Sequence, residues 1–281
     1  MEKVDQERVF VAAQALVQWF ESEVSYVIAL SGGVDSAVVA AAAARAGCQC
    51  VAVTARSPSV AAAEMEDAEQ VAKQIGIEHH FVDTSEIGDE HYQRNDGRRC
   101  FHCKTHLFTA LGASYPNAVI VTGTNLDDLG DYRPGLEAAQ NAGVRAPLAE
   151  LGITKDALRA IGHSWSIEIA DKPASPCLAS RLAYGVEVTT ERLYRVEQAE
   201  TFLRKHVGQV LRVRTHDGEL ARIEVPVDQI ERVARTSMRQ LITESLKELG
   251  FRYVTLDLIG FQSGNLNQQL VQIQSNGSTG S

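Results

Sequence analysis

"YVIALSGGVDSAVVAAAAA", residues 26–44, passes from an apolar, β-branched run through two glycines into an alanine-rich stretch. The first part has the composition of a buried strand, and the last part has that of a buried helix. The glycines between them permit positive φ and a close approach of the backbone to another group. The stretch therefore predicts a strand, a tight turn and a helix, and it raises the question of what the turn holds.

The same alternation continues along the chain. Strand candidates occupy residues 24–30, 48–54, 78–83 and 118–123, and helical patterns occupy 36–46, 59–75 and 101–114. Near-continuous apolar strands separated by helices are typical of a parallel sheet covered on both faces. We therefore expect an α/β fold with a doubly wound parallel sheet, followed by a smaller α+β domain.

The pattern changes after "DKPASPCLASRLAYG", residues 171–185. A helix (190–206), two strands (209–216 and 219–226), a helix (227–249) and a strand (251–258) follow, with the turn signal "HDGE" between the first two strands. We expect a first domain over 1–170 and a linker over 171–185 that carries Cys177. An α+β domain for substrate binding or oligomerisation should cover 186–270, and a disordered tail should cover 271–281.

Composition limits the possible partners. The formal net charge of −9 gives no general basic surface, so we expect no nucleic-acid partner. The N-terminus lacks the order of a secretion signal, and no apolar run is long enough to span a membrane. We expect a cytoplasmic protein without a membrane partner, in which the five cysteines are thiols or ligands rather than disulfides.

The turn "SGGVDS" has the features of a phosphate site. A helix that begins directly after the glycines points its free N–H groups and its positive dipole end at the turn. No lysine follows as in GxxxxGK[ST], and the spacing is not GxGxxG. The backbone at Gly32 and Gly33 and the hydroxyls of Ser31 and Ser36 can bind a pyrophosphate, and Asp35 can help to hold Mg²⁺.

This turn resembles the PP-loop of the N-type ATP pyrophosphatases, which cleave ATP between the α and β phosphates and adenylate a substrate. The resemblance continues at "VTARSP" (53–58), where that family meets adenine, and at "TGTNLDD" (122–128). It implies ATP contacts at Thr54, Arg56, Gly123 and Thr124. It also implies that carboxylates after the fourth strand reach the metal, unless they form only a solvated acidic turn; the candidates are Asp127, Asp128 and Asp131.

Four further strings together resemble the LarE family, sulfur transferases of nickel-pincer cofactor biosynthesis. They are "DYRPGLEAAQNAGVRAPL" (131–148), "SPCLASRLAYG" (175–185), "LRVRTHDGELARIEVP" (211–226) and "LGFRYVTLDLIGFQSG" (249–264). The resemblance implies adenylation of pyridinium-3,5-biscarboxylic acid mononucleotide and its conversion to thiocarboxylates. It implies that Cys177 handles sulfur, that Arg181, Arg212 and Arg214 bind the anionic substrate, and that the protein is a homo-oligomer such as a hexamer.

The stretch "RRCFHCK" (98–104) departs from family members that consume a single cysteine. Cys100, Cys103 and Cys177 can give three thiolates to a [4Fe–4S] cluster and leave one iron for hydrosulfide, supplied by inorganic sulfide or another sulfur donor. This pattern resembles cluster-dependent LarE homologues and certain tRNA thiolases. Zinc completed by His102 or His106, a redox disulfide and uncommitted thiols remain alternatives. Cys48 and Cys50 open an apolar strand, and we expect them to be structural.

Three functions compete at this point. The leading one is sulfur insertion for the nickel-pincer cofactor, either with a cluster or with Cys177 as a sacrificial donor. A tRNA thiolase would use the same ATP chemistry, but it would usually need an extended basic surface. A nucleotide-binding regulator would not need the three cysteines.

Overall fold

The computed structural model describes residues 6–21, 23–130 and 134–262. Asp131 and the tail from 271 to 281 lie outside the described residues. The chain divides into two compact units, one made of residues 1–86 and 100–175 and the other of 87–99 and 176–281. Within the described residues, no helix combines the length and the apolar character needed to cross a bilayer.

The first unit is built on a four-stranded parallel sheet with the order β3-β2-β1-β4. Its strands are β1 (Ser25–Ala29), β2 (Gln49–Arg56), β3 (His79–Asp83) and β4 (Val119–Val121). All four correspond to predicted strands. Since β1 and β2 occupy the centre, they are the strands buried on both faces, which explains their nearly continuous apolar sequences.

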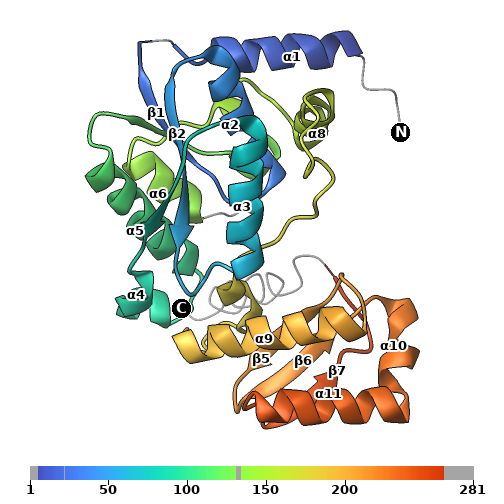
Figure 1. Cartoon of the computed structure of the whole chain (residues 1–281). Coiled ribbons are helices and arrows are strands. Elements are labelled where there is room, and N and C mark those ends of the chain that lie inside the picture. The colour runs from blue at the N-terminus through green and yellow to red at the C-terminus, as the bar shows by residue number, and fades with distance from the viewer. Residues whose placement is uncertain (1–5, 22, 131–133, 263–281) are drawn as a thin grey trace, which may run out of the picture. The chain divides into compact units, whose positions relative to one another are not determined.

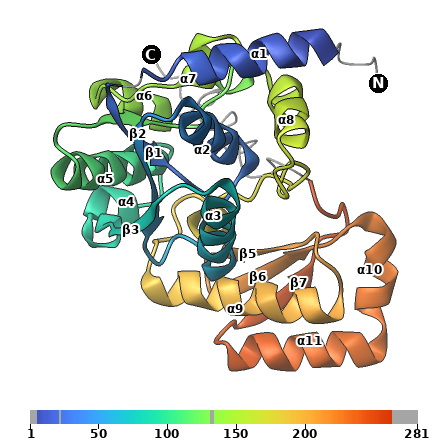
Figure 2. The same ribbon diagram turned by 45° about the horizontal axis from the view of Figure 1, so that its top comes forward.

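Helices cover both faces of this sheet (Figures 1 and 2). Ile28 and Ala52 pack in a core on one face, whereas their neighbours Val27 and Val53 pack in a separate core on the other. The helices of this unit are α1 (Gln6–Gln18), α2 (Val34–Ala46), α3 (Ala62–Ile75), α5 (Arg99–Ser114), α6 (Pro134–Asn141), α7 (Pro147–Glu150) and α8 (Lys155–Ser164), with the short η2 (Asp127–Gly130). The expected doubly wound α/β class is confirmed.

The second unit contains a three-stranded sheet, β5-β6-β7. β5 (Arg212–His216) and β6 (Leu220–Glu224) are antiparallel and joined by the predicted turn, and β7 (Tyr253–Leu256) lies parallel to β6. The helices are η1 (Glu86–Gly88, which begins in the first unit), α4 (Glu90–Gln93), η3 (Leu178–Arg181), α9 (Thr190–His206), α10 (Val227–Ala234) and α11 (Thr236–Glu248). The single helix expected over 227–249 is divided at Arg235, whose ψ of 144° is extended.

Segment 87–99 joins the second unit through Asn95. This residue is fully buried and has φ 52°, a conformation that asparagine tolerates better than most residues. Its side-chain amide donates to the carbonyls of Ala183 at 2.7 Å and Val186 at 2.8 Å. The Arg99 guanidinium donates to the Asn95 side-chain oxygen at 2.5 Å and to the Ala179 carbonyl at 2.9 Å. These buried bonds fix the segment that leads into α5.

A polar cluster at the edge of the first unit joins α1 to α7. Glu150 receives two hydrogen bonds from the Arg145 guanidinium, at 2.8 and 2.5 Å, and one from the Trp19 indole at 2.9 Å. The Arg145 guanidinium also lies 4.8 Å from the centroid of the Trp19 ring. Hydrogen bonding to Arg145 lowers the pKa of Glu150 to about 2, against burial that acts to raise it.

We predict that Glu150→Gln destabilises the first unit at pH 7 by about 1 to 2 kcal/mol, after a discount for the partial exposure of the ion pair. Because the pKa of Glu150 is lower in the folded state, the stabilisation by its ion pair is fully present at pH values above the ordinary pKa of glutamate. It is lost as the pH falls toward about 2. Urea unfolding followed by tryptophan fluorescence reports on this unit, which contains both Trp19 and Trp165. Glu66→Gln on the exposed face of α3 is the control, and a difference from wild type that does not shrink between pH 7 and pH 3 contradicts the assignment.

Candidate active site

The strand order creates a switch point between β1 and β4. Successive connections lead from β1 to β2 and from β2 to β3, whereas β4 adds on the opposite side of β1. The carboxyl ends of β1 and β4 are therefore adjacent, with Ile28 opposite Val121. Ligands of open α/β sheets bind at such points. "SGGVDS" follows β1 and "TGTN" follows β4, so the two motifs meet at this edge.

Two glycines allow the motifs to pack closely. Gly32 has φ 73°, and a Cβ on it would lie 2.5 Å from the Glu64 carbonyl oxygen of α3. A Cβ on Gly123 would lie 2.5 Å from the backbone nitrogen of Ser36 and 2.7 Å from the carbonyl carbon of Asp35. The loop after β4 is therefore in backbone contact with the first turn of α2, and only glycine fits there.

Hydroxyl groups close the turn from inside. The Ser31 N–H donates to Ser36 Oγ at 3.1 Å, and Ser36 Oγ donates to the Gly33 carbonyl at 3.0 Å. Ser36 is buried, whereas Ser31 is exposed. Gly33 is the N-cap of α2 and supplies no side-chain cap to the helix. The N–H groups at the start of this 13-residue helix can therefore serve an anion, as the sequence predicts.

Asp35 bridges the two motifs. Its Oδ1 accepts a hydrogen bond from the Asn125 amide at 2.8 Å, and its Oδ2 accepts one from the Lys155 ammonium. Asn125 is buried. The sequence reading predicted Asp35 but neither partner. Asn125 belongs to "TGTNLDD" (122–128), whereas Lys155 follows the helix cap Thr154 and has no local signal for its contact with Asp35.

The acidic residues after β4 are engaged in the same network. Asp127 Oδ2 accepts from the Lys155 backbone N–H at 2.7 Å, and Asp128 Oδ2 accepts from the Asn125 N–H at 3.1 Å. Asn125 Oδ1 in turn accepts from the Asp127 N–H at 2.9 Å. The loop is thus locked onto the start of α8. Asp35 and Asp127 share Lys155 as a partner, which brings together two of the four residues expected to hold Mg²⁺.

The residues expected near adenine have internal partners. Thr54 is buried, and its hydroxyl donates to the Leu30 carbonyl at 2.8 Å and lies 2.8 Å from His79 Nε2. Thr54 thus joins β2 to the residue before the phosphate turn. Arg56 is exposed and paired with Asp83 at 2.6 Å across β2 and β3. The hydroxyl of Thr124, next to Gly123, lies 3.3 Å from that of Thr122.

The second unit buries several arginines in ion pairs. Arg181 pairs with Glu200 at 3.0 Å and also donates to the Pro176 and Cys177 carbonyls. Arg214 pairs with Glu224 at 3.0 Å. Both arginines are almost fully buried, at 2% and 6% exposure, so each requires its carboxylate partner. The Arg181 bonds also fix the backbone on which Cys177 stands, at the N-cap of η3.

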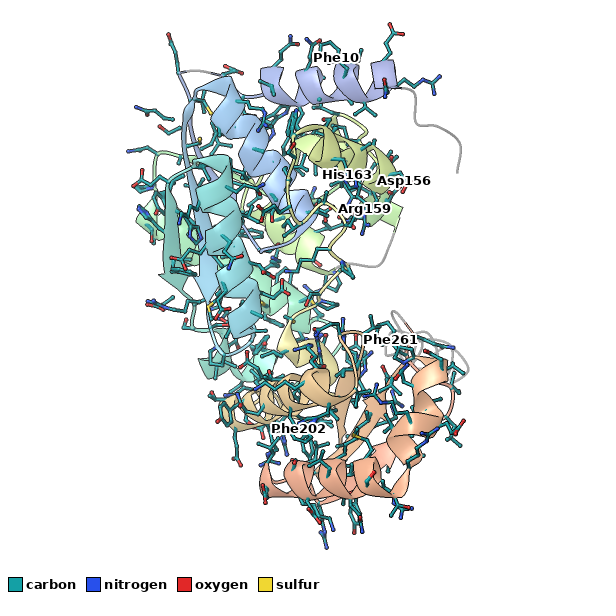
Figure 3. The ribbon with its side chains drawn as sticks, turned by 45° about the vertical axis from the view of Figure 1, so that its right-hand side comes forward. Phe10, Asp156, Arg159, His163, Phe202 and Phe261 are labelled. Atoms are coloured by element: carbon teal, nitrogen blue, oxygen red, sulfur yellow. The ribbon has the colours of Figure 1, made fainter. Side chains whose placement is uncertain are left out.

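Arg212 differs from these two. It donates to the Leu211 carbonyl at 2.7 Å and lies 5.3 Å from the centroid of the Phe261 ring, which is labelled in Figure 3. No carboxylate among the described residues forms an ion pair with it. Burial and the charge of Arg181 lower its pKa to about 10. Arg212 is therefore a partly buried cation that an anionic ligand would stabilise.

The cysteines fall into three groups. Cys48 is buried and Cys50 half-buried, and burial raises the pKa of Cys50 to about 12, which agrees with a structural role. Cys100 and Cys103 stand one helical turn apart in the first turns of α5, so they lie on one face of that helix. Cys177 belongs to the second unit. Among the described residues, no group of three or more His, Cys, Asp or Glu side chains forms a metal site.

Comparison with known proteins supports the reading of these motifs. Residues 12–91 match the family described as asparagine synthase. Pyridinium-3,5-bisthiocarboxylic acid mononucleotide synthase of Lactiplantibacillus plantarum is 32% identical over 252 residues, or 88% of this chain and 90% of that protein. The chain belongs to the LarE family. Two uncharacterized proteins are also similar to this chain. One, of Synechocystis sp., is 43% identical over 92% of this chain and 97% of its own length. The other, of Methanocaldococcus jannaschii, is 28% identical over 84% of this chain and 90% of its own length.

We predict that Gly123→Ala weakens binding of magnesium pyrophosphate more than about tenfold. The added Cβ meets the backbone at Asp35 and Ser36, so the first turn of α2 must shift and its N–H donors must lose their alignment. Gly112→Ala in α5 is the control, because a Cβ there meets nothing within 4 Å in the described part of the chain. Calorimetric titration of both variants measures the difference, and wild-type affinity in Gly123→Ala contradicts the role of this contact.

Proposed function

We propose that this LarE member is an ATP-dependent sulfur transferase that converts pyridinium-3,5-biscarboxylic acid mononucleotide to its thiocarboxylates. The observation that carries the proposal is the phosphate turn at the switch point, with Asp35 bridged to the loop after β4. Similarity to the L. plantarum synthase over most of both chains supports the substrate. The cytoplasmic location and the homo-oligomeric state stay predictions.

The first step is activation of a carboxylate. A carboxylate oxygen attacks the α-phosphorus of ATP, and pyrophosphate leaves with the electrons of the broken phosphoanhydride bond. N–H groups at the start of α2 stabilise the departing pyrophosphate. Asp35 and Asp127 would hold Mg²⁺, which neutralises charge on the phosphates. The Lys155 ammonium pairs with Asp35 and its backbone N–H donates to Asp127, so this lysine lies beside both of these residues.

The second step is sulfur transfer. Hydrosulfide attacks the acyl-adenylate, AMP leaves with the carboxylate oxygen, and a thiocarboxylate and a proton remain. Cys100, Cys103 and Cys177 would hold a [4Fe–4S] cluster, which when bound supplies hydrosulfide at the iron without a protein ligand. The shared helix face of Cys100 and Cys103 suits two of these three ligands. In the alternative, Cys177 gives up its own sulfur once.

We predict that anaerobically reconstituted protein binds about four irons per chain and that Cys100→Ala, Cys103→Ala and Cys177→Ala each abolish this. With sulfide and ATP, the wild type should produce more than one thiocarboxylate per chain while Cys177 keeps its mass. Cys50→Ala is the control because this thiol lies outside the set. One turnover per chain with loss of hydrogen sulfide from Cys177 would instead establish the sacrificial route.

Arg212 is the arginine best suited to bind the substrate's phosphate or carboxylate, because Arg181 and Arg214 already pair with buried glutamates. Arg181 and Arg214 would act indirectly, because their ion pairs set the electrostatic environment of Arg212. We predict that Arg212→Ala lowers the affinity for the pyridinium substrate about tenfold or more, since the lost hydrogen bonds are charge-assisted. The affinity for ATP should stay within about twofold of the wild-type value.

Titration calorimetry with each ligand separates the two effects. Arg235→Ala is the matched control, because Arg235 is an exposed arginine paired with Glu231 in the same unit. Equal loss of ATP and substrate affinity would assign Arg212 to the nucleotide instead.

A further inference from the structure

Lys172 makes three contacts that the proposed function does not use. Its ammonium donates to the Gly32 carbonyl at 2.9 Å, to Glu64 Oε2 at 2.8 Å and to Asp67 Oδ2 at 2.6 Å. The side chain is only 18% exposed. All these residues belong to the first unit. A lysine distant in sequence thus donates a hydrogen bond directly to the backbone of the phosphate turn.

The contact with the Gly32 carbonyl fixes a specific peptide group. In a trans peptide the C=O of one residue and the N–H of the next point in opposite directions. When Lys172 holds the Gly32 carbonyl on its own side, the Gly33 N–H must point to the other side. Two consecutive glycines restrict their shared peptide group less than any other pair would. The hydrogen bond from Lys172 therefore fixes the orientation of the Gly32–Gly33 peptide group, which the two glycines do not fix by themselves.

The ammonium is held in place from several directions. Glu64 and Asp67 stand three residues apart on α3, so their carboxylates share one face of that helix. α3 itself packs against the turn, since a Cβ on Gly32 would collide with the Glu64 carbonyl. The backbone of Lys172 is also bound, because its carbonyl accepts from the Arg159 guanidinium at 3.4 Å. Figure 3 shows Arg159 on α8.

We propose that Lys172 is a positioning residue that orients the Gly32–Gly33 peptide so that the Gly33 N–H faces the β and γ phosphates of ATP. Two carboxylates keep the lysine in this place, and they prevent its ammonium from binding phosphate itself. The inference rests on the proposed function only in taking the turn as the phosphate site. It assigns to Lys172 a contribution to pyrophosphate affinity and none to the affinity for AMP.

The test is calorimetric titration of the full chain with magnesium pyrophosphate and, separately, with AMP. Lys172→Met keeps the aliphatic part of the side chain but cannot donate a hydrogen bond. It should lower the affinity for pyrophosphate about tenfold, while the affinity for AMP stays within about twofold. Lys172→Arg should recover most of the pyrophosphate affinity. Lys73→Met, an exposed lysine of α3, is the matched control and should match wild type for both ligands.

If Lys172→Met folds poorly, Lys172→Gln takes its place, because its side chain is polar but neutral and shorter than that of lysine, and it should also weaken pyrophosphate binding selectively. Parallel loss of pyrophosphate and AMP affinity together with a lower melting temperature would mean that Lys172 only joins α3 to the turn. Unchanged pyrophosphate affinity in Lys172→Met would also overturn the inference, and it would leave the proposed function intact. A wild-type protein that binds neither ATP nor pyrophosphate would overturn the proposed function itself.

Discussion

The backbone contact between Gly123 and the first turn of α2 is the constraint on which the candidate site depends. It is possible because β1 and β4 are parallel neighbours whose following loops emerge at the same edge of the sheet. Once the loops touch, Asp35 can reach Asn125 and Lys155, and the loop after β4 is locked to α8. A side chain at Gly123 would separate these groups, because a packed backbone has no flexible end that can give way.

In the second unit, arginine side chains are buried inside a small α+β fold. Burial acts to raise the pKa of Glu200, but the charges of Arg181, Arg204 and Arg212 outweigh it and hold the pKa below its usual value. Glu200 therefore stays ionised and can pair with Arg181. Among the described residues, Arg212 has no carboxylate ion-pair partner, and its guanidinium lies over the Phe261 ring instead. Such an arrangement favours an anionic ligand over water.

The fold could be predicted from local sequence patterns, because the spacing of apolar residues that marks a strand or a helix is visible within a short stretch of sequence. All four strands of the first sheet and the phosphate turn follow from apolar runs and from the two glycines. Contacts across long sequence separations were not predictable in this way. Lys155 reaches Asp35 over 120 positions and Lys172 reaches Gly32 over 140, and no local signal distinguishes these lysines from solvated ones. Arg181 and Arg214 were predicted as ligand-binding residues from their positions in motifs, but the sequence could not reveal their buried glutamate partners.

We propose that the turn after β1 supports attack of a substrate carboxylate on the α-phosphate of ATP. Substrate labelled with ¹⁸O in its carboxylates tests this directly, because the oxygen that attacks phosphorus leaves with AMP when sulfur takes its place. We predict one AMP molecule carrying a single ¹⁸O atom for every thiocarboxylate formed, together with unlabelled pyrophosphate. Formation of ADP and phosphate, or of AMP without the label, would contradict it.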